Sequence, residues 1–385
     1  MRITRLGLWV LTLSGQLLAC GEATKAPDPV ALGEQFLMLP PGFPAPVIPA
    51  TNPLTAEKIE LGRRLFYEQR LSVNGSTSCS SCHAQDLGFA DGRQVSLGAL
   101  EDPMPRNSPG LANVAYNANL TWANPLIDTL EQQILIPLFS EHPVELGATG
   151  NEERILLRLA ADSTYVELFR QAFPESDGNI GWGHIVDALA CFLRTLISGD
   201  SPYDRFVYRG QEDALSAAAK RGIEVFFSEV TECHHCHGGF NFTLSTVHQG
   251  SVFEAEDFHN TGLYSVNDSG AYPEPNTGVH AVTGDFEDMG KFRAPTLRNV
   301  ELTAPYMHDG SIETLEGVIR HYEAGGRNVE SGPYAGDGRR SPLKSGFVQG
   351  FSLTDRQRDD LLEFLLSLTD ESFVHDPRFA RPGAL

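Results

Sequence analysis

Apolar residues recur with a period of about 3.6 over several stretches of the chain, with polar residues on the opposite side. The clearest stretches predict helices over Glu152–Ala161, Ile185–Ile197, Ile312–Glu323 and Thr354–Leu368. Long segments rich in Gly, Pro and Asn separate these stretches and predict loops. We therefore expect a mainly α-helical protein in which long loops connect the helices.

The same pattern occurs twice along the chain. The helical stretch Gly62–Tyr67 reads GRRLFY, and Gly222–Phe227 reads GIEVFF. Farther along each half, PGLANV at Pro109–Val114 corresponds to PTLRNV at Pro295–Val300, so the motif P-x-L-x-N-V is repeated. Such internal repetition is typical of two homologous units. The sequence predicts two homologous domains in tandem, joined near residue 200.

The N-terminus has the pattern of an export signal. In residues 1–19, two arginines precede an apolar run that ends in Leu-Leu-Ala before Cys20, as in bacterial lipoprotein signals. We expect Cys20 to carry a lipid anchor, the protein's only membrane attachment, on a periplasm-facing or surface-facing protein of a Gram-negative-type bacterium. An ordinary signal peptide with an incidental cysteine is the alternative. Residues 20–53 predict a tether and extended entry segment, followed by domains at 54–200 and 201–385.

The chain is strongly acidic, with a formal net charge of −21. Nucleic-acid binding depends on Lys and Arg side chains that replace the counterions of phosphates, so we expect no nucleic-acid partner. A solvated acidic surface explains this charge at least as well as electrostatic steering of a basic protein partner.

The cysteines predict covalent haem attachment. Four of the six lie in two C-x-x-C-H motifs, namely Cys79-Ser-Ser-Cys82-His83 and Cys233-His-His-Cys236-His237. In such a motif the thiols add to the haem vinyl groups, and the adjoining histidine ligates the iron. Zinc requires four ligands, whereas each motif offers three in a cramped order, so we disfavour zinc. We predict two haem c groups, one bound at each motif, and therefore two cytochrome c-like haem domains in tandem.

Three other residues, two histidines and one cysteine, are predicted to have no binding or catalytic role of their own. His234 and His235 fill the two variable positions of the second motif. Cys191 lies in the apolar stretch Ala-Leu-Ala-Cys-Phe-Leu and is predicted to be a small buried side chain.

From about residue 54 to residue 368, these ordered motifs resemble the bacterial di-haem cytochrome c peroxidase family, which includes the MauG enzymes. In that family the first haem is peroxidatic, the second relays electrons, and a calcium ion and a tryptophan lie between them. The resemblance implies that Trp122 is this tryptophan and that the calcium ligands are Asn107, Thr303 and Pro305. Amide and backbone oxygens suit calcium. Without the resemblance, Asn107 would be interpreted as a turn residue and Trp122 as core.

The resemblance also implies a distal peroxide pocket on the first haem, formed by Gln133 and Glu145. Peroxide cleavage needs a group that takes a proton from one oxygen and returns it to the other, and the carboxylate of Glu145 suits this role. The stretch between these two residues is longer than is usual in the family. Glu141 or His142 could therefore share the pocket, an alternative that affects Gln133 more than Glu145.

Two positions depart from the ordinary peroxidases of the family. Those enzymes cap the resting first haem with a loop histidine, but the corresponding residue is Ala99, and no histidine lies between His83 and His142. We therefore expect an open first haem that needs no reductive activation. The second haem of those enzymes has a methionine ligand, where this chain has Tyr322, as in MauG-type enzymes. The competing ligand is His321, but neighbours on a helix point about 100° apart, and we prefer Tyr322.

These two departures imply a MauG-type, hydrogen peroxide-dependent oxidoreductase. Such an enzyme stores two oxidising equivalents across both haems and oxidises a residue of a partner protein. The stretch from Pro137 to Gly147 also resembles the methanobactin-associated branch, in which a partner's tryptophan becomes kynurenine. One alternative is a conventional peroxidase supplied by a small cytochrome or cupredoxin, which Tyr322 argues against. Another is a non-catalytic electron-transfer cytochrome, which Glu145 and Ala99 argue against.

Overall fold

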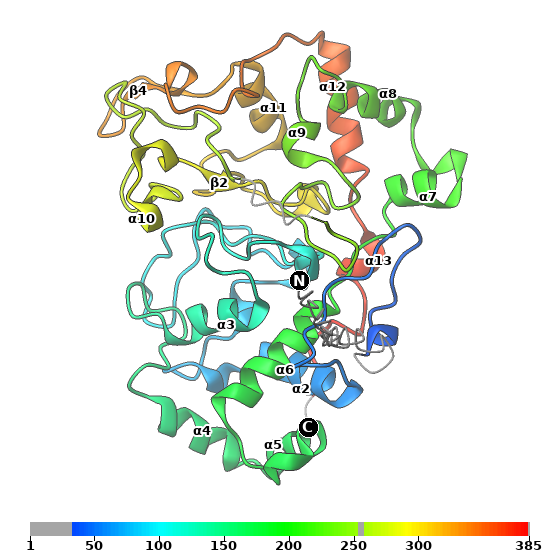
Figure 1. The fold of residues 1–385 in the computed structure, drawn as a ribbon, viewed down its shortest axis with the longest axis vertical. Coiled ribbons are helices and arrows are strands. Elements are labelled where there is room, and N and C mark those ends of the chain that lie inside the picture. Colours follow the sequence, from blue (N-terminus) through cyan, green and yellow to red (C-terminus); the bar gives the residue numbers. More distant parts are fainter. Residues whose placement is uncertain (1–32, 253–257, 384–385) are drawn as a thin grey trace, which may run out of the picture.

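The computed structural model describes residues 33–252 and 258–383, so the predicted signal and Cys20 lie outside the described residues. Within this part the chain is rich in helices, as predicted (Figure 1). Its strands form two short antiparallel pairs, which are β1 (Phe258–His259) with β2 (Phe292–Arg293), and β3 (Asn328–Val329) with β4 (Gly336–Asp337). None of the helices in the described ranges is both long enough and apolar enough to cross a membrane.

The longer helices are α2 (Ala56–Phe66), α3 (Leu130–Phe139), α4 (Glu152–Ala160), α5 (Ser163–Ala172), α6 (Trp182–Arg194), α7 (Pro202–Arg209), α8 (Ala217–Phe226), α11 (Leu315–Glu323) and α12 (Asp355–Leu366). Single-turn helices are α9 (His234–His237), α10 (His280–Thr283) and α13 (Glu371–Val374). The four predicted helical stretches coincide with α4, α6, α11 and α12, with shifted ends. For example, α11 begins at Leu315 because the Thr314 hydroxyl accepts a hydrogen bond from the Gly317 N–H and caps the helix.

Two pairs of helices cross in the same way. In the first pair, α2 lies so close to α6 that a Cβ on Gly62 would be 1.9 Å from the backbone oxygen of Ala188. In the second pair, α8 lies so close to α12 that a Cβ on Gly222 would be 2.0 Å from the backbone oxygen of Asp360. Only glycine permits such an approach. The repeat in the sequence therefore corresponds to one helix crossing that is built twice, in the lower and upper halves of Figure 1.

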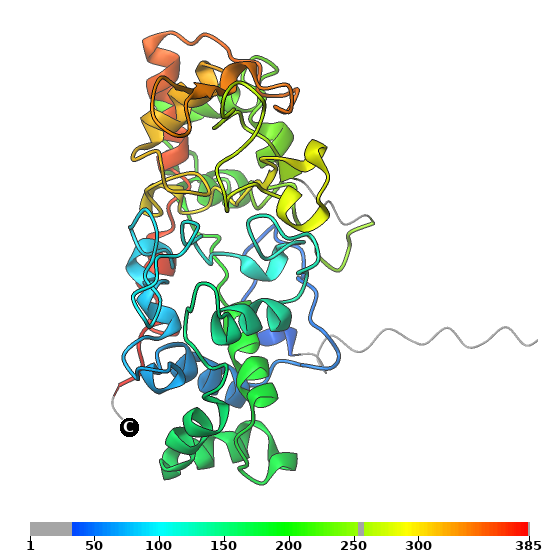
Figure 2. The ribbon, with the colours of Figure 1, turned by 90° about the vertical axis from the view of Figure 1, so that its left-hand side faces the viewer.

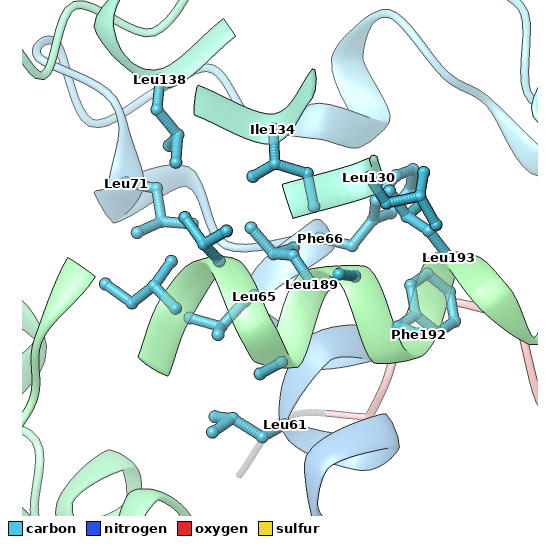
Figure 3. Packing of buried hydrophobic residues seen from close by; sticks show 14 of the residues in the cluster. Leu61, Leu65, Phe66, Leu71, Leu130, Ile134, Leu138, Leu189, Phe192 and Leu193 are labelled. Carbon is cyan, nitrogen blue, oxygen red and sulfur yellow. The ribbon is translucent and has the colours of Figure 1, made fainter. Parts of the chain in front are cut away.

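Each crossing has its own hydrophobic core. Figure 3 shows the first core between α2, α3 and α6, with side chains that include Leu61, Leu65, Phe66, Leu130, Ile134, Leu189 and Phe192. The second core joins α8, α11 and α12 through Phe226, Phe242, Leu315, Ile319, Leu361, Phe364 and Leu365. A third cluster, which includes Tyr272, Met289 and Phe292, packs against Trp122. This contact joins the two halves of the chain.

The end of the chain returns to the first core. Phe373, Val374 and Phe379 pack there, although the sequence analysis assigned them to the second domain. Figure 2 shows this terminal segment running down beside the helices of the first half. The side chain of Asp370 explains the position, because it accepts hydrogen bonds from the Ser198 hydroxyl and from the backbone N–H of Gly199, at 3.1 and 2.9 Å.

The entry segment packs against the first half. Leu37, Ile48 and Leu54 form a small cluster with Cys191, which is fully buried as predicted. The Cys191 thiol donates a hydrogen bond to Asn52 Oδ1 at 3.3 Å. At least from Leu37 onward, this extended segment is therefore part of the folded body.

Candidate functional site

The two C-x-x-C-H motifs share one local construction. In the first motif, His83 Nδ1 donates a hydrogen bond of 2.7 Å to the backbone oxygen of Phe89. In the second, His237 Nδ1 lies 3.2 Å from the backbone oxygen of Phe242. Both phenylalanines have positive φ angles, 63° and 49°, which bring each carbonyl round toward its histidine. A proton held on Nδ1 leaves the Nε2 lone pair available for a metal, the usual arrangement of a ligating histidine.

A large cavity adjoins each motif. The first is lined by Cys79, Cys82 and His83, with empty space of about 1810 Å³ that includes open solvent. The second is lined by Cys233, Cys236 and His237, with a corresponding space of about 1780 Å³. Burial lowers the pKa of His83, which favours the neutral, metal-binding form of its imidazole. Both cavities therefore bring together the two thiols and the imidazole that haem attachment requires.

An arginine in the second cavity supports haem as the group that fits there. Arg293 lines this cavity and is almost fully buried, and its Nη1 has no hydrogen-bond partner within the described ranges. Its Nε donates to the Thr121 backbone oxygen at 3.2 Å. Burial lowers the pKa of Arg293 to about 10. Since a buried guanidinium needs an anionic partner, a haem propionate is suited to complete its contacts.

The predicted distal residues line the first cavity. Glu145, Gln133 and His142 all contribute to its wall, whereas Glu141 is exposed and is not among the lining residues. Burial raises the pKa of Glu145 to about 6, so this carboxyl can take and release a proton near neutral pH. Gln133 Oε1 is buried and has no protein partner in the part of the chain described. The distal roles of these residues remain predictions.

The loop at Ala99 is fixed against the segment that carries Glu145. The Ala99 N–H donates a hydrogen bond of 2.6 Å to the backbone oxygen of Glu145, and Asn74 Nδ2 donates to the Ala99 oxygen at 2.6 Å. The residue before Ala99 is Gly98, and a Cβ there would lie 1.9 Å from the backbone oxygen of Val144, so the two segments are in close contact. The loop thus forms part of the cavity wall through Gly98, and Ala99 offers no side chain that could ligate iron.

Tyr322 and His321 point in different directions from α11. Tyr322 lines the second cavity together with His237. Burial, and then the neighbouring thiols of Cys236 and Cys233, raise the pKa of Tyr322. His321 is not among the lining residues, and its Nε2 lies 3.0 Å from the backbone oxygen of Thr261. This geometry favours Tyr322 over His321 as the ligand of an iron held by His237.

Trp122 lies between the two cavities and lines both of them. Its Nε1 donates a hydrogen bond of 2.8 Å to the backbone oxygen of Asn107, and its own backbone oxygen accepts one of 2.8 Å from the Arg293 N–H. The Asn107 oxygen thus orients the indole, and the Arg293 N–H holds the backbone of the same residue. An aromatic ring in this position is suited to carry an electron from one cavity to the other.

The three predicted calcium ligands line the second cavity, namely Asn107, Thr303 and Pro305. The Asn107 side-chain amide donates to the Arg93 backbone oxygen at 2.9 Å, and its backbone N–H donates to the His308 oxygen at 2.8 Å. Because the nitrogen end of the carboxamide is occupied, Oδ1 is the atom suited to a cation. Calcium at this position remains a prediction.

Sequence reasoning missed three residues of the cavity walls. Arg293 has its counterpart in Arg106, which lines the first cavity, and each arginine precedes a P-x-L-x-N-V motif, a repeated signal that could have identified both. His308 is buried in the second cavity, where its ring stacks on Phe292 at a centroid distance of 3.6 Å. Burial lowers the pKa of His308 to about 4, so the imidazole is neutral. Spacing alone gave no signal for His308.

Comparison with known proteins agrees with this geometry. The family model for di-haem cytochrome c peroxidase matches residues 56–213. The chain is 34% identical over 362 residues to the methylamine utilization protein MauG of Methylorubrum extorquens, with 94% of this chain and 91% of the relative covered. It is 31% identical over 312 residues to the cytochrome c551 peroxidase of Pseudomonas aeruginosa, covering 80% and 85%.

A solved structure is also similar over most of its length. It is the crystal structure of a MauG-like protein associated with microbial copper homeostasis. The two chains are 49% identical, with a TM-score of 0.87, and the match covers 90% of this chain and 98% of the other.

Proposed function

Since the chain belongs to the di-haem cytochrome c peroxidase and MauG family, an oxidoreductase family acting on hydrogen peroxide, we propose that it is a MauG-type enzyme that oxidises a residue of a partner protein. The observation that carries the proposal is the side chain of Tyr322 in the cavity of His237. Ordinary peroxidases of the family resemble this chain elsewhere but have methionine there.

Tyrosine and methionine ligands favour different chemistry. A phenolate is a hard anion that stabilises oxidised iron, whereas a thioether raises the reduction potential. Two bound haems supply the iron chemistry that accepts oxidising equivalents from hydrogen peroxide. A second site that tolerates a high oxidation state suits an enzyme that stores these equivalents before a protein substrate is oxidised.

The chain's own residues supply the remaining functions. Glu145, with its pKa of about 6, moves the proton between the two peroxide oxygens. Trp122 lies between the two cavities and carries the electron. Ala99 offers no ligand at the position of the capping histidine, which supports entry of peroxide without prior reduction of the enzyme.

The more specific part of the proposal concerns the partner. We propose that it is a metal-binding protein and that a tryptophan on it is converted to kynurenine. The similarity to a MauG-like protein associated with microbial copper homeostasis supports such a partner. A calcium ion at Asn107, Thr303 and Pro305, and export with a lipid anchor at Cys20, complete the proposal.

A conventional peroxidase is the second candidate. Its support is the similarity to the cytochrome c551 peroxidase of Pseudomonas aeruginosa, which spans 80% of the chain. Such an enzyme would draw electrons from a small cytochrome or cupredoxin.

One experiment separates the two functions. Hydrogen peroxide is added to the protein with both haems oxidised, the optical spectrum is followed, and proteins that co-purify with it or are encoded by neighbouring genes are analysed by mass spectrometry. We expect an immediate spectral change and a modified tryptophan on the partner. A spectral change that requires prior reduction, with an unmodified partner and steady consumption of electrons from a donor, would establish the conventional peroxidase instead.

A further inference from the structure

Two histidines and two glutamates gather on the surface beside the second haem motif. This His–Glu cluster consists of Glu229, Glu232, His234 and His235. His234 Nε2 lies 3.6 Å from one Glu229 oxygen, and His235 Nε2 lies 3.5 Å from the other. His235 Nε2 is also 2.9 Å from a Glu232 oxygen. Sequence analysis had interpreted both histidines as variable positions of the C-x-x-C-H motif.

We infer that the His–Glu cluster binds one divalent transition-metal ion, with Cu(II) held more tightly than Zn(II). The ligand atoms of Glu229, His234 and His235 all lie within 4.8 Å of one another. Ligands about 2.0–2.1 Å from an ion lie about 2.8 Å apart in a square plane and about 3.4 Å apart in a tetrahedron, so the imidazole–carboxylate separations of 3.6 and 3.5 Å need to close slightly around Cu(II). Imidazole nitrogens favour copper and zinc over magnesium or calcium, and copper precedes zinc in the order of stabilities.

The two imidazoles are held so that their Nε2 atoms converge. The rings of His234 and His235 lie 4.2 Å apart, and the ring of Phe347 stacks on His235 at 4.6 Å with an interplanar angle of 9°. His234 Nδ1 is buried and has no hydrogen-bond partner in the described part of the chain, so Nε2 is the ring's ligating atom. Glu229 is 79% exposed, which leaves the ion a path from solvent.

The His–Glu cluster is also coupled to the second haem site. His234 and His235 lie between Cys233 and Cys236, while Glu232 and Phe347, which contact His235, line the second cavity. A bound divalent ion adds positive charge beside this cavity and disfavours a further positive charge on the iron. Metal binding therefore raises the reduction potential of the second haem. The metal site itself does not depend on the function proposed above.

Calorimetric titration of the complete protein, with both haems attached and any affinity tag removed, tests the site. We expect one Cu(II) per chain and weaker, competing Zn(II). Glu229→Gln, at an exposed position, is expected to weaken Cu(II) binding at least tenfold, and His235→Gln to weaken it more. His375→Gln is the matched control, because His375 and Glu371 form an exposed pair at 3.4 Å that belongs to no three-ligand group among the described residues. Equal Cu(II) affinity in all four proteins, or no saturable binding, would overturn the inference.

Electron paramagnetic resonance of the Cu(II) form identifies the ligands independently of affinity. We expect hyperfine coupling to two imidazole nitrogens, reduced to one in His234→Gln. The effect of the bound metal on the reduction potential of the second haem is measured by redox titration with and without Zn(II), which is redox-inert. A positive shift in the wild type that is absent in Glu229→Gln supports the coupling, whereas Zn(II) binding without a shift would overturn it and leave the metal site intact.

Discussion

Trp122 Nε1 donates a hydrogen bond of 2.8 Å to the backbone oxygen of Asn107, and both residues line both cavities. The tryptophan proposed to carry electrons is therefore oriented by the residue proposed to bind calcium. A change at either residue is expected to alter communication between the two haem sites, even when both haems remain attached.

The first prediction concerns Trp122→Phe. Phenylalanine keeps an aromatic ring but loses the indole N–H, so the Asn107 oxygen loses a donor and stability falls by about 1–3 kcal/mol. We expect the peroxide-induced spectral change at the second haem to slow at least tenfold in stopped-flow measurements. Trp182→Phe is the control, because Trp182 packs edge-on against Phe139 at 5.0 Å, away from both cavities. If the spectral change slowed equally in both variants, the proposed electron-carrying role of Trp122 would be wrong.

The second prediction is a pH dependence set by Glu145. Burial raises the pKa of this carboxyl to about 6, above its ordinary value of about 4.3. Its deprotonated form, which accepts the first proton from peroxide, therefore accumulates as the pH rises through about 6. We expect the rate of the peroxide reaction to increase over that interval.

Glu145→Gln cannot exchange this proton, so its rate should fall by about 10²- to 10⁴-fold and lose the titration near pH 6. Glu141→Gln is the matched control, since the Glu141 side chain is exposed and does not line the cavity. If Glu141→Gln loses the titration and Glu145→Gln retains it, the acid/base assignment is wrong.

The third prediction separates Tyr322 from His321. Tyr322→Phe removes the phenol from the second cavity, so the optical and magnetic spectra of the second haem should change. His321→Gln should leave these spectra as they are, because His321 does not line the second cavity and its Nε2 lies 3.0 Å from the Thr261 backbone oxygen. That variant should lose about 1 kcal/mol of unfolding free energy with its hydrogen bond. A spectral change in His321→Gln alone would make histidine the ligand.

Features that depend on short sequence spacing were predictable. The C-x-x-C-H motifs, the helical stretches and the repeated P-x-L-x-N-V all involve neighbours along the chain. The repeat carries a further feature, since Asn113 and Asn299 adopt the same left-handed conformation, with φ of 59° and ψ of 23°, at the start of matching short helices. Equivalent residues in the two halves thus have the same local structure.

Features that depend on distant contacts were not predictable. Tertiary burial leaves Nη1 of Arg293 without a partner among the residues that the structure describes. The return of Phe373 to the first core depends on hydrogen bonds from the segment after α6 to Asp370, in a region without an apolar period. The metal-binding role of the His–Glu cluster was not predicted for another reason, because the haem motif already accounted for both histidines as its variable positions.

The fourth prediction tests the doubled helix crossing. In Gly62→Ala the new methyl group would overlap the Ala188 backbone oxygen, and in Gly222→Ala it would overlap the Asp360 backbone oxygen. Because backbone must shift in both cases, each variant should lose about 1–3 kcal/mol of unfolding free energy, measured by chemical denaturation. Gly183→Ala is the control within α6, since a Cβ there meets nothing within 4 Å and alanine favours the helix. If Gly62→Ala or Gly222→Ala were as stable as Gly183→Ala, the close crossing of that helix pair would be wrong.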